Sequence, residues 1–547
     1  MSQPSTALLS VTNLGLTVNH DSNKPLLKSI SFEIQKGEIF ALVGESGSGK
    51  SLTSLAIMRL LPDALTIHSG DICLKQQSLF ALPELKMQKV RGKSIAMIFQ
   101  EPMTALNPVM TIGKQVAEVL EIHLGLKKDA VRHKVAELFK EVGLNDAEQR
   151  YDWYPHQLSG GQKQRVMIAM ALACEPELLI ADEPTTALDV TIQAQVLRLL
   201  KQIRKQRGLS ILFITHDMGV VAEMADRVAV MREGEIVEQA DCSHFFTNPQ
   251  HPYTQRLLKD ALPTKTKHTQ AATENTTKRL LEIKDLKVHF PIKKGIFQRI
   301  AGHVKAVNGV TLSIPKGKTL ALVGESGSGK STIGQAVLRL LNITEGKVYF
   351  NQTDLTSLSE KQLKPYRQKI QVIFQDPYSA LNPRMTIGEI IREGMNSLKV
   401  EPTDKAAQDR RIKELLCKVD LLAEHAERYP HEFSGGQRQR IGIARALAVK
   451  PELIICDEPT SALDVSVRAQ VLKLLNTLQQ ESGVSYLFIT HDLSIIPTIA
   501  HEVAVMKEGK IIEQGLVNEV MKNPQQDYTQ TLLASAPALV KEHISKI

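Results

Sequence analysis

Two copies of one short sequence are the first residues that suggest a chemistry. GESGSGKS occupies residues 44–51 and returns unchanged at residues 324–331. Its pattern, G-x-x-x-x-G-K-S, lets backbone N–H groups curl around phosphate oxygens, while the lysine reaches the terminal phosphates and the serine hydroxyl can ligate Mg²⁺. The predicted nucleotide-binding residues are Gly44, Glu45, Ser46, Gly47, Ser48, Gly49, Lys50 and Ser51, and Gly324, Glu325, Ser326, Gly327, Ser328, Gly329, Lys330 and Ser331.

A pair of carboxylates ends a strongly apolar segment in each half of the chain, in LLIADE and in LIICDE. The first carboxylate of such a pair suits Mg²⁺, held directly or through water. The second suits the polarisation of a water molecule for in-line attack on a γ-phosphate. We therefore expect Asp182 and Asp457 to bind the metal, and Glu183 and Glu458 to be catalytic.

A histidine follows a further apolar segment, LFIT, in each half of the chain. These residues, His216 and His491, are each followed by an aspartate. A histidine at the end of a buried strand can contact a γ-phosphate, but this role depends on the other motifs being present.

The segments QLSGGQKQR and EFSGGQRQR place a serine and two glycines at the start of a helix. Such a helix end binds anions through its free N–H groups and the helix dipole. A nucleotide held by a phosphate-binding loop already has one face covered, so this second anion-binding end must come from another domain. The duplication is then explained if the two halves pack head-to-tail, with ATP between the loop of one half and the SGG of the other.

The motifs recur in the same order and at nearly constant spacing. The glutamine of IFQ, the serine of SGG, the second carboxylate and the histidine each return 275 residues later, whereas the loop lysine returns after 280. The second copy therefore lacks five residues, in a segment that we expect to be a turn (PDALTIHSG against NITEG). A fixed internal period indicates a duplicated domain.

Each phosphate-binding loop follows an apolar strand and opens an apolar helix. The strands are predicted at 39–43 and 319–323, and the helices at 54–61 and 334–341. LLIA and LIIC are typical of buried parallel strands, and RVMIAMALA and RIGIARALA of helices that pack on a sheet. The sequence thus predicts two α/β domains.

The composition agrees with two globular domains. Of the 547 residues, 43% are hydrophobic and 23% are charged, so extensive disorder is excluded. No apolar run reaches the roughly 18–20 residues that span a bilayer. The five cysteines are scattered, which favours reduced thiols. The net charge of +8 fits a mixed solvated surface, but also a nucleic acid, an anionic membrane surface or a bound nucleotide, so it does not decide between them. The polar segment 264–279 is predicted to link domains 1–263 and 280–547.

In this order, and twice, the loop, the glutamine, SGGQ, the acidic pair, ALD and the histidine resemble the ATP-binding subunits of ABC transporters. The resemblance covers nearly the whole chain. It implies two tandem P-loop NTPase (ABC ATPase) domains, each with a RecA-like α/β core, an antiparallel β-subdomain and a helical subdomain. It also implies ATP and Mg²⁺ as cofactors, with hydrolysis in both halves.

The resemblance also assigns further site residues. Gln100 and Gln375 would act in catalysis and, with Ser51 and Ser331, at the metal. Asp189 and Asp464 resemble the D-loop residues that cross the domain interface. The residues that would cap the ATP of the opposite half are Ser159, Gly160, Gly161, Gln162, Ser434, Gly435, Gly436 and Gln437.

The family usually stacks an aromatic side chain on adenine near the start of the domain. Phe290 fits that position in the second half, whereas the first half has Val18, which puts adenine stacking there in doubt. Some relatives carry a Cys-rich tail, which this chain lacks, so no iron–sulfur cluster is predicted.

Three kinds of ABC protein could have this organisation. Twin ATPases that act on ribosomes usually carry a long charged helical arm between their domains, and DNA-repair ATPases carry coiled coils or zinc-binding Cys pairs; neither feature is present. QEPMTALNP, QDPYSALNP, NPQHPYTQRLL and the insertion at 291–310 resemble peptide and nickel importers. We therefore expect an importer of peptides, with nickel or glutathione as alternative cargoes.

The expected partners follow from that resemblance. They are two integral membrane permease subunits and, indirectly, an external solute-binding protein, with no role for nucleic acid. The chain would lie peripherally on the cytoplasmic face of the membrane, and the surface near Gln100 and Gln375 would push on short helices of the permeases.

Overall fold

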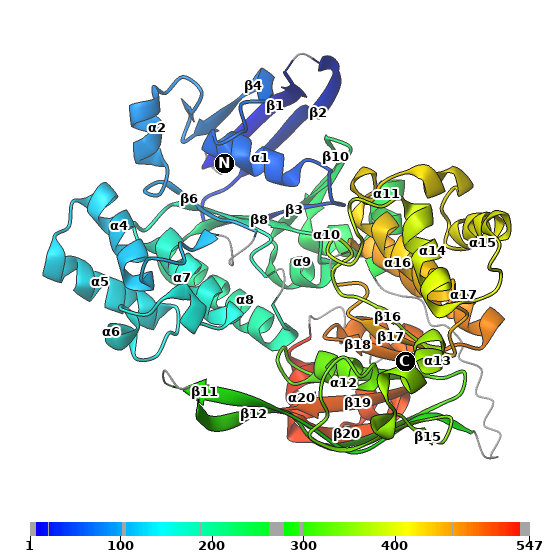
Figure 1. The fold of residues 1–547 in the computed structure, drawn as a ribbon. Helices are drawn as coiled ribbons and strands as arrows, with labels where there is room; N and C mark the ends of the chain where they lie inside the picture. The colour runs from blue at the N-terminus through cyan, green and yellow to red at the C-terminus, as the bar shows by residue number, and fades with distance from the viewer. Residues whose placement is uncertain are drawn as a thin grey trace. The chain divides into compact units, whose positions relative to one another are not determined.

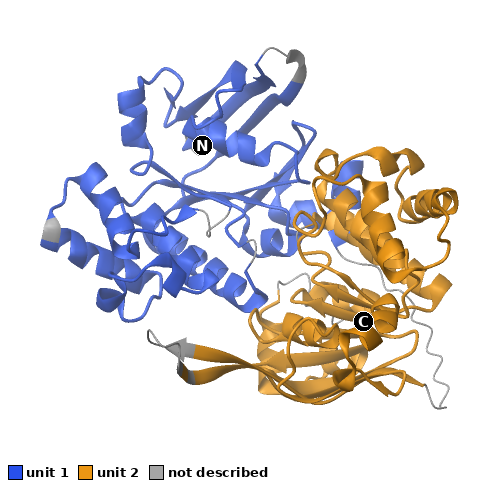
Figure 2. Cartoon of the chain, viewed as in Figure 1, with its two compact units in different colours: residues 1–261, 537–539 blue, residues 262–536, 540–547 orange. Residues whose placement is uncertain are grey.

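The computed structural model describes residues 7–19, 21–100, 105–185, 188–261, 278–294, 299–461 and 463–536. They form two compact units, with the boundary after Ala261 (Figure 2). Of the predicted linker, residues 264–277 lie outside the described part of the chain. Each unit contains two sheets and a set of helices, and is the α/β domain that the sequence predicts (Figure 1).

The larger sheet of the first unit has six strands in the order β10-β9-β3-β8-β7-β6. All neighbouring pairs are parallel except β10 and β9. Every residue of β3 and β7 is buried, as expected of parallel strands that are covered on both faces. The bounds are β3 (Ile39–Val43), β6 (Ile95–Ile98), β7 (Leu178–Asp182), β8 (Ser210–Thr215), β9 (Arg227–Arg232) and β10 (Glu235–Asp241).

The smaller sheet of the first unit is antiparallel, with the order β2-β1-β4-β5. Its strands are β1 (Leu9–Val18), β2 (Asp21–Ile34), β4 (Leu65–Leu74) and β5 (Gln77–Ser78). The turn predicted for PDALTIHSG is wrong, because residues from Leu65 onward pair with β1 as far as Val18. The extra residues of the first half thus lengthen β4 and its pairing with β1.

The helices of the first unit cover the larger sheet. α1 ends at Met58, before the predicted end, because Arg59 adopts a left-handed φ of 50°. Phe40 and Leu42 of β3 pack in the cluster that contains the antiparallel sheet and α1, while Ala41 and Val43 pack on the opposite face. The helices are α1 (Lys50–Met58), α2 (Glu84–Val90), α4 (Ile112–Leu124), α5 (Lys128–Glu141), α6 (Ala147–Arg150), α7 (Gly160–Leu172), α8 (Val190–Arg207), α9 (Met218–Met224), α10 (Cys242–Thr247) and α11 (Pro252–Ala261).

The second unit repeats these two sheets. Its six-stranded sheet has the order β16-β17-β18-β13-β19-β20, and its antiparallel sheet the order β12-β11-β14-β15. The strands are β11 (Arg279–Lys294), β12 (Arg299–Pro315), β13 (Thr319–Val323), β14 (Glu345–Phe350), β15 (Thr353–Asp354), β16 (Ile370–Ile373), β17 (Leu453–Asp457), β18 (Ser485–Thr490), β19 (Glu502–Lys507) and β20 (Lys510–Leu516). The insertion noted at 291–310 forms the far end of the β11–β12 hairpin, which pairs as far as Lys294 and Arg299.

The helices of the second unit are α12 (Lys330–Val337), α13 (Glu360–Lys369), α14 (Ile387–Leu398), α15 (Lys405–Lys418), α16 (Gly435–Leu447), α17 (Val465–Ser482), α18 (Ile496–Ile499), α19 (Val517–Lys522) and α20 (Asp527–Ala534). α12, like α1, ends before its predicted end, and Arg339 has a left-handed φ of 56°. Across the described ranges, no helix has both the length and the apolar character that crossing a membrane requires.

The strand order brings the predicted site residues together. In the first unit, β3, β8, β7 and β6 are parallel neighbours, so their carboxyl ends lie at one edge of the sheet. In open α/β sheets, ligands bind in the crevice outside these strand ends. The phosphate-binding loop, the histidine, the acidic pair and the glutamine follow these four strands in that order.

Candidate nucleotide-binding and hydrolysis sites

Each phosphate-binding loop is folded around its own lysine. The buried Lys50 donates from Nζ to the carbonyl oxygens of Gly44 and Glu45, both at 2.8 Å. Lys330 makes the same bonds in the second unit, at 2.8 and 2.7 Å. The predicted glycine-rich cradle is therefore already formed, with its ammonium group in the middle of the loop.

The first glycine of the loop is required by a close approach of the backbone. Gly44 has a φ of 153°, and a Cβ added to it would lie 2.2 Å from the carbonyl oxygen of Met231, at the end of β9. Gly324 has the same environment, 2.1 Å from the Met506 carbonyl oxygen. A side chain at this position would push the loop away from the sheet edge that holds it.

The first carboxylate of each acidic pair lies against the serine of the loop. Ser51 Oγ donates to Asp182 Oδ1 at 3.2 Å, and Ser331 Oγ donates to Asp457 Oδ1 at 2.8 Å. Burial raises the pKa of both carboxyl groups, although these hydrogen bonds oppose the shift. A hydroxyl and a carboxylate side by side are the hard oxygen donors that Mg²⁺ prefers, so these residues fit the predicted ion.

The second carboxylate of each acidic pair lies beside the glutamine and the histidine of the same unit. In the first unit, Gln100 Nε2 donates to Glu183 Oε2 at 2.9 Å, and His216 Nδ1 lies 3.1 Å from Glu183 Oε1. In the second unit, Gln375 Nε2 lies 3.0 Å from Glu458 Oε2, and His491 Nδ1 lies 3.1 Å from the same oxygen. The ends of three strands that are far apart in sequence thus meet at one carboxylate in each unit.

Both glutamates have an unusual backbone. The φ of Glu183 is 47° and that of Glu458 is 45°, in the left-handed region that residues with a side chain seldom occupy. Strained residues of this kind persist where the surrounding structure holds them, and they cluster at functional sites. The N–H of each glutamate donates to the neighbouring strand, at Ile214 and Ile489 respectively, which fixes the turn.

The charges in the second-unit cluster influence one another. Burial alone would raise the pKa of Glu458, but the hydrogen bond from His491 and the positive charges of His491 and Lys330 outweigh it and lower the pKa. Burial alone would lower the pKa of His491, but Glu458 outweighs it and raises the pKa. The pair therefore favours an ionised glutamate that can accept a proton or orient a water molecule.

The SGGQ residues begin the helices that the sequence predicts. Ser159 caps α7, accepting from the Gln162 N–H at 3.3 Å, while Gln162 Oε1 accepts from the Ser159 N–H at 3.0 Å. A Cβ on Gly161 would lie 2.5 Å from Ile192 of α8, so the glycine allows the two helices to pack closely. Ser434, Gln437 and Gly436 repeat this arrangement at the start of α16.

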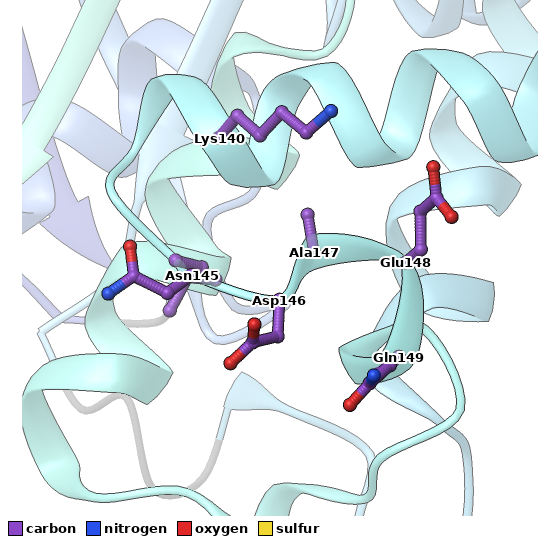
Figure 3. A pocket seen from close by; sticks show the side chains of 7 residues that line it. Lys140, Asn145, Asp146, Ala147, Glu148 and Gln149 are labelled. Carbon is purple, nitrogen blue, oxygen red and sulfur yellow. The ribbon is translucent and has the colours of Figure 1, made fainter.

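The hydrogen bonds described above join the strand-end residues of each unit without involving SGGQ. The loop serine bonds to the first carboxylate and the glutamine and histidine to the second, whereas SGGQ begins α7 or α16. In the second unit, a cavity of about 870 Å³ is lined by Ser434, Gly436 and Gln437 together with the basic residues Lys418, Arg440 and Lys473. In the first unit, a smaller cavity of about 490 Å³ lies by α5 and α6; it contains none of the predicted residues (Figure 3).

The proposed adenine-stacking residue lies on the long hairpin of the second unit. Phe290 is on β11, opposite Val304, and 40% of its surface is exposed, which leaves its ring accessible to a flat ligand. Val18 is the last residue of β1 in the first unit and is only partly buried. An exposed aromatic ring is therefore present at this position in the second unit, whereas the first unit has the aliphatic side chain of Val18 there.

Tyr528 is a residue at the site that sequence reasoning did not identify. Its hydroxyl accepts a hydrogen bond from the backbone N–H of Glu325, in the phosphate-binding loop, at 3.3 Å, and Lys507 lies over its ring. The turn before it is held by Glu513, which accepts from the N–H groups of Gln525 and Gln526. The available signal was the spacing, since Tyr253 precedes Tyr528 by the same 275 residues as the other site residues.

Replacing Tyr528 with phenylalanine should therefore weaken nucleotide binding. The loss of one neutral hydrogen bond costs about 1 kcal/mol, so we expect the KM for ATP to rise roughly three- to fivefold with little change in kcat. Steady-state ATPase measurements test this expectation. Tyr366→Phe, a partly buried tyrosine on α13 of the same unit, is the control, and an unchanged KM in Tyr528→Phe would contradict the role.

Two family models match this sequence. A model described as ABC transporter matches residues 27–186 and 307–461, which together cover more than half of the chain. The chain belongs to the ABC transporter family. A second model, described as Oligopeptide/dipeptide transporter, C-terminal region, matches residues 237–285 and 512–546. This ABC protein is an ATP-binding subunit with two cassettes, and subunits of this kind hydrolyse ATP.

Curated relatives align with this ABC subunit along nearly its whole length. The peptidoglycan transport ATP-binding protein YejF of Agrobacterium fabrum (strain C58) is 48% identical over 97% of this chain and 96% of its own length. The glutathione import ATP-binding protein GsiA of Salmonella paratyphi A is 45% identical over 97% of this chain and 89% of its own. A solved structure of the ATP-binding cassette MJ0796 bound to ADP and Pi is 29% identical, with a TM-score of 0.40, and covers 43% of this chain and 98% of its own.

Proposed function

We propose that this chain is the motor subunit of a bacterial importer that takes up short peptides through separate membrane subunits. The observation that carries the proposal is the match to the oligopeptide/dipeptide transporter C-terminal region in both halves of the chain. That region contains Tyr528, which contacts a phosphate-binding loop, so the part of the chain typical of the transporter branch lies against the nucleotide site. The relatives named for peptidoglycan transport and glutathione import support transport rather than ribosome action.

In the proposed mechanism, two ATP molecules join the halves head-to-tail. The loop, acidic pair, glutamine and histidine of one half would hold each nucleotide from one side, and the SGGQ helix start of the other half would cap its γ-phosphate. The positions of Ser159 and Ser434 as the N-caps of α7 and α16 support this role, because the N-terminus of a helix attracts anions. Each ATP then stabilises the closed state, and its hydrolysis favours the open state.

Within each site, different residues would bind the phosphates, hold the metal ion and orient the water molecule. Lys50 and Lys330 would neutralise phosphate charge, and Mg²⁺ would be held by Ser51 and Asp182 or by Ser331 and Asp457, with help from Gln100 and Gln375. When bound, the ion supplies charge neutralisation at the phosphate oxygens. Glu183 and Glu458 would orient the attacking water, with the neighbouring histidine and glutamine fixing each carboxylate.

The proposed partners are two integral membrane permease subunits and an external solute-binding protein that delivers cargo to them. The chain would bind the permeases at the cytoplasmic face of the membrane through the surface near Gln100 and Gln375. Phe99 and Phe374, beside these glutamines, are 44% and 42% exposed, so each half offers an aromatic side chain there. The cargo would not contact this chain.

Reconstitution tests the proposed function. The chain, co-purified with the membrane subunits that associate with it, would be placed in proteoliposomes with the proposed binding protein and supplied with ATP. We expect uptake of a labelled tripeptide, and none with the Glu183→Gln, Glu458→Gln chain. Uptake of glutathione or nickel instead would show that the cargo is not a general peptide. If the chain were found bound to ribosomes and without permease subunits, the importer role would be rejected.

A further inference from the structure

The two units differ in one contact beside their histidines. In the second unit, Arg468 Nη1 donates to Asp492 Oδ2 at 2.6 Å, and the two side chains form an ion pair. The equivalent position in the first unit, 275 residues earlier, is Gln193. Gln193 Nε2 lies 3.4 Å from Asp217 Oδ2. A short charge-assisted bond in one unit thus corresponds to a long, weaker bond in the other.

Asp492 is attached directly to the catalytic cluster of the second unit. It follows His491, which is paired with Glu458 at 3.1 Å. Its own N–H donates to Thr490 Oγ1 at 3.0 Å, and its Oδ1 accepts from the N–H of Ser494 at 2.9 Å. The aspartate therefore defines the turn that carries the histidine, and Arg468 holds the remaining carboxylate oxygen.

The other end of this connection is the start of α17. Arg468 lies in the first turns of that helix, and its N–H donates to the carbonyl oxygen of Asp464 at 2.8 Å. Asp464 is the N-cap residue immediately before α17, and it resembles a residue that crosses the domain interface. Arg468 and Asp492 are only 23% and 26% exposed, so water screens their attraction less than it would a surface pair.

We propose that Arg468 is a positioning residue that ties the start of α17 to His491, and through it to Glu458. The second site then hydrolyses ATP only when α17 holds the histidine in place. The first site, with Gln193, is coupled more loosely, so the two sites turn over ATP unequally. This inference rests on the proposed function only in requiring ATP hydrolysis by the chain.

The test isolates the second site. In a full-length chain whose first site is silenced by Glu183→Gln, we expect Arg468→Gln to lower the remaining kcat about tenfold, with the KM for ATP changing less than twofold. Arg468→Lys should recover most of that loss, because an ammonium group can still pair with Asp492. Lys413→Gln, which removes a positive charge from an exposed position on α15 of the same unit, is the matched control.

A second measurement does not depend on turnover. In the NMR spectrum of histidine-labelled protein, with the His491 signal assigned by its loss in His491→Asn, that signal should move in Arg468→Gln and stay in place in Lys413→Gln. Equal kcat values in Arg468→Gln and its parent, or an unmoved His491 signal, would overturn the proposal. If the parent does not hydrolyse ATP, the proposed function loses support, and the NMR result alone decides the role of Arg468.

Discussion

A chain carrying both Glu183→Gln and Glu458→Gln is expected to bind ATP and to lose about a thousandfold in kcat. Each glutamate is held by a glutamine and a histidine at 2.9–3.1 Å, so an amide at the same place keeps the geometry but cannot accept a proton. General-base catalysis typically contributes 10²–10⁴ in rate, which sets the expected loss. Phosphate-release kinetics measure the turnover, and equilibrium binding of a fluorescent ATP analogue measures the retained affinity.

The chain offers a matched control for this variant. Glu233 and Glu508 are also separated by 275 residues and have left-handed φ values of 49° and 46°, but they lie on exposed turns. Glu233→Gln with Glu508→Gln makes the same charge change outside the site and should leave kcat within a factor of two, the range of a surface substitution. Normal turnover in Glu183→Gln, Glu458→Gln would exclude both residues as the groups that activate water.

Much of the fold could be predicted because each sequence pattern occurs in both halves of the chain. IFALV and TLALV are strands with the predicted bounds, since a continuous apolar run between turn residues suits a parallel strand buried on both faces. The ends of α1 and α12 were predicted too late, because MRLL (58–61) and LRLL (338–341) continue the helical pattern after the backbone has turned at Arg59 and Arg339. The β4 extension was missed because its polar residues pair through the backbone, which the side-chain pattern does not report.

The site could be predicted only as far as motifs define it. The motifs identify the glutamine, the glutamate and the histidine, and parallel strand order brings these three to one edge of the sheet, whereas their catalytic roles stay predictions. The contact of Tyr528 with the loop could not be predicted, because a hydroxyl reaching a backbone N–H 203 residues away in sequence leaves no local pattern. The contrast between Arg468 and Gln193 was visible as a substitution between the repeats, but its partner, Asp492, required the structure.

Replacing both loop lysines, as Lys50→Met with Lys330→Met, should remove nucleotide binding rather than turnover alone. Each ammonium group is buried and bonded to two loop carbonyl oxygens, so it both shapes the cradle and supplies its positive charge. Methionine has a side chain of similar length to lysine but carries no charge. Because a hydrogen bond to a charged group is worth about 1.5–3 kcal/mol, we expect the affinity for ATP to fall about a hundredfold. Titration calorimetry with ATP and Mg²⁺ measures it.

A lysine pair outside the site provides the control for this variant. Lys36 and Lys316 are separated by the same 280 residues as the loop lysines but are exposed, so Lys36→Met with Lys316→Met should bind ATP normally. Methionine also removes two buried charges, so a thermal melt must show that the variant folds. If Lys50→Met, Lys330→Met still binds ATP tightly, the cradle is held by backbone N–H groups alone. If it loses ATP while Glu183→Gln, Glu458→Gln retains it, binding and water activation reside in separate residues of the same sheet edge.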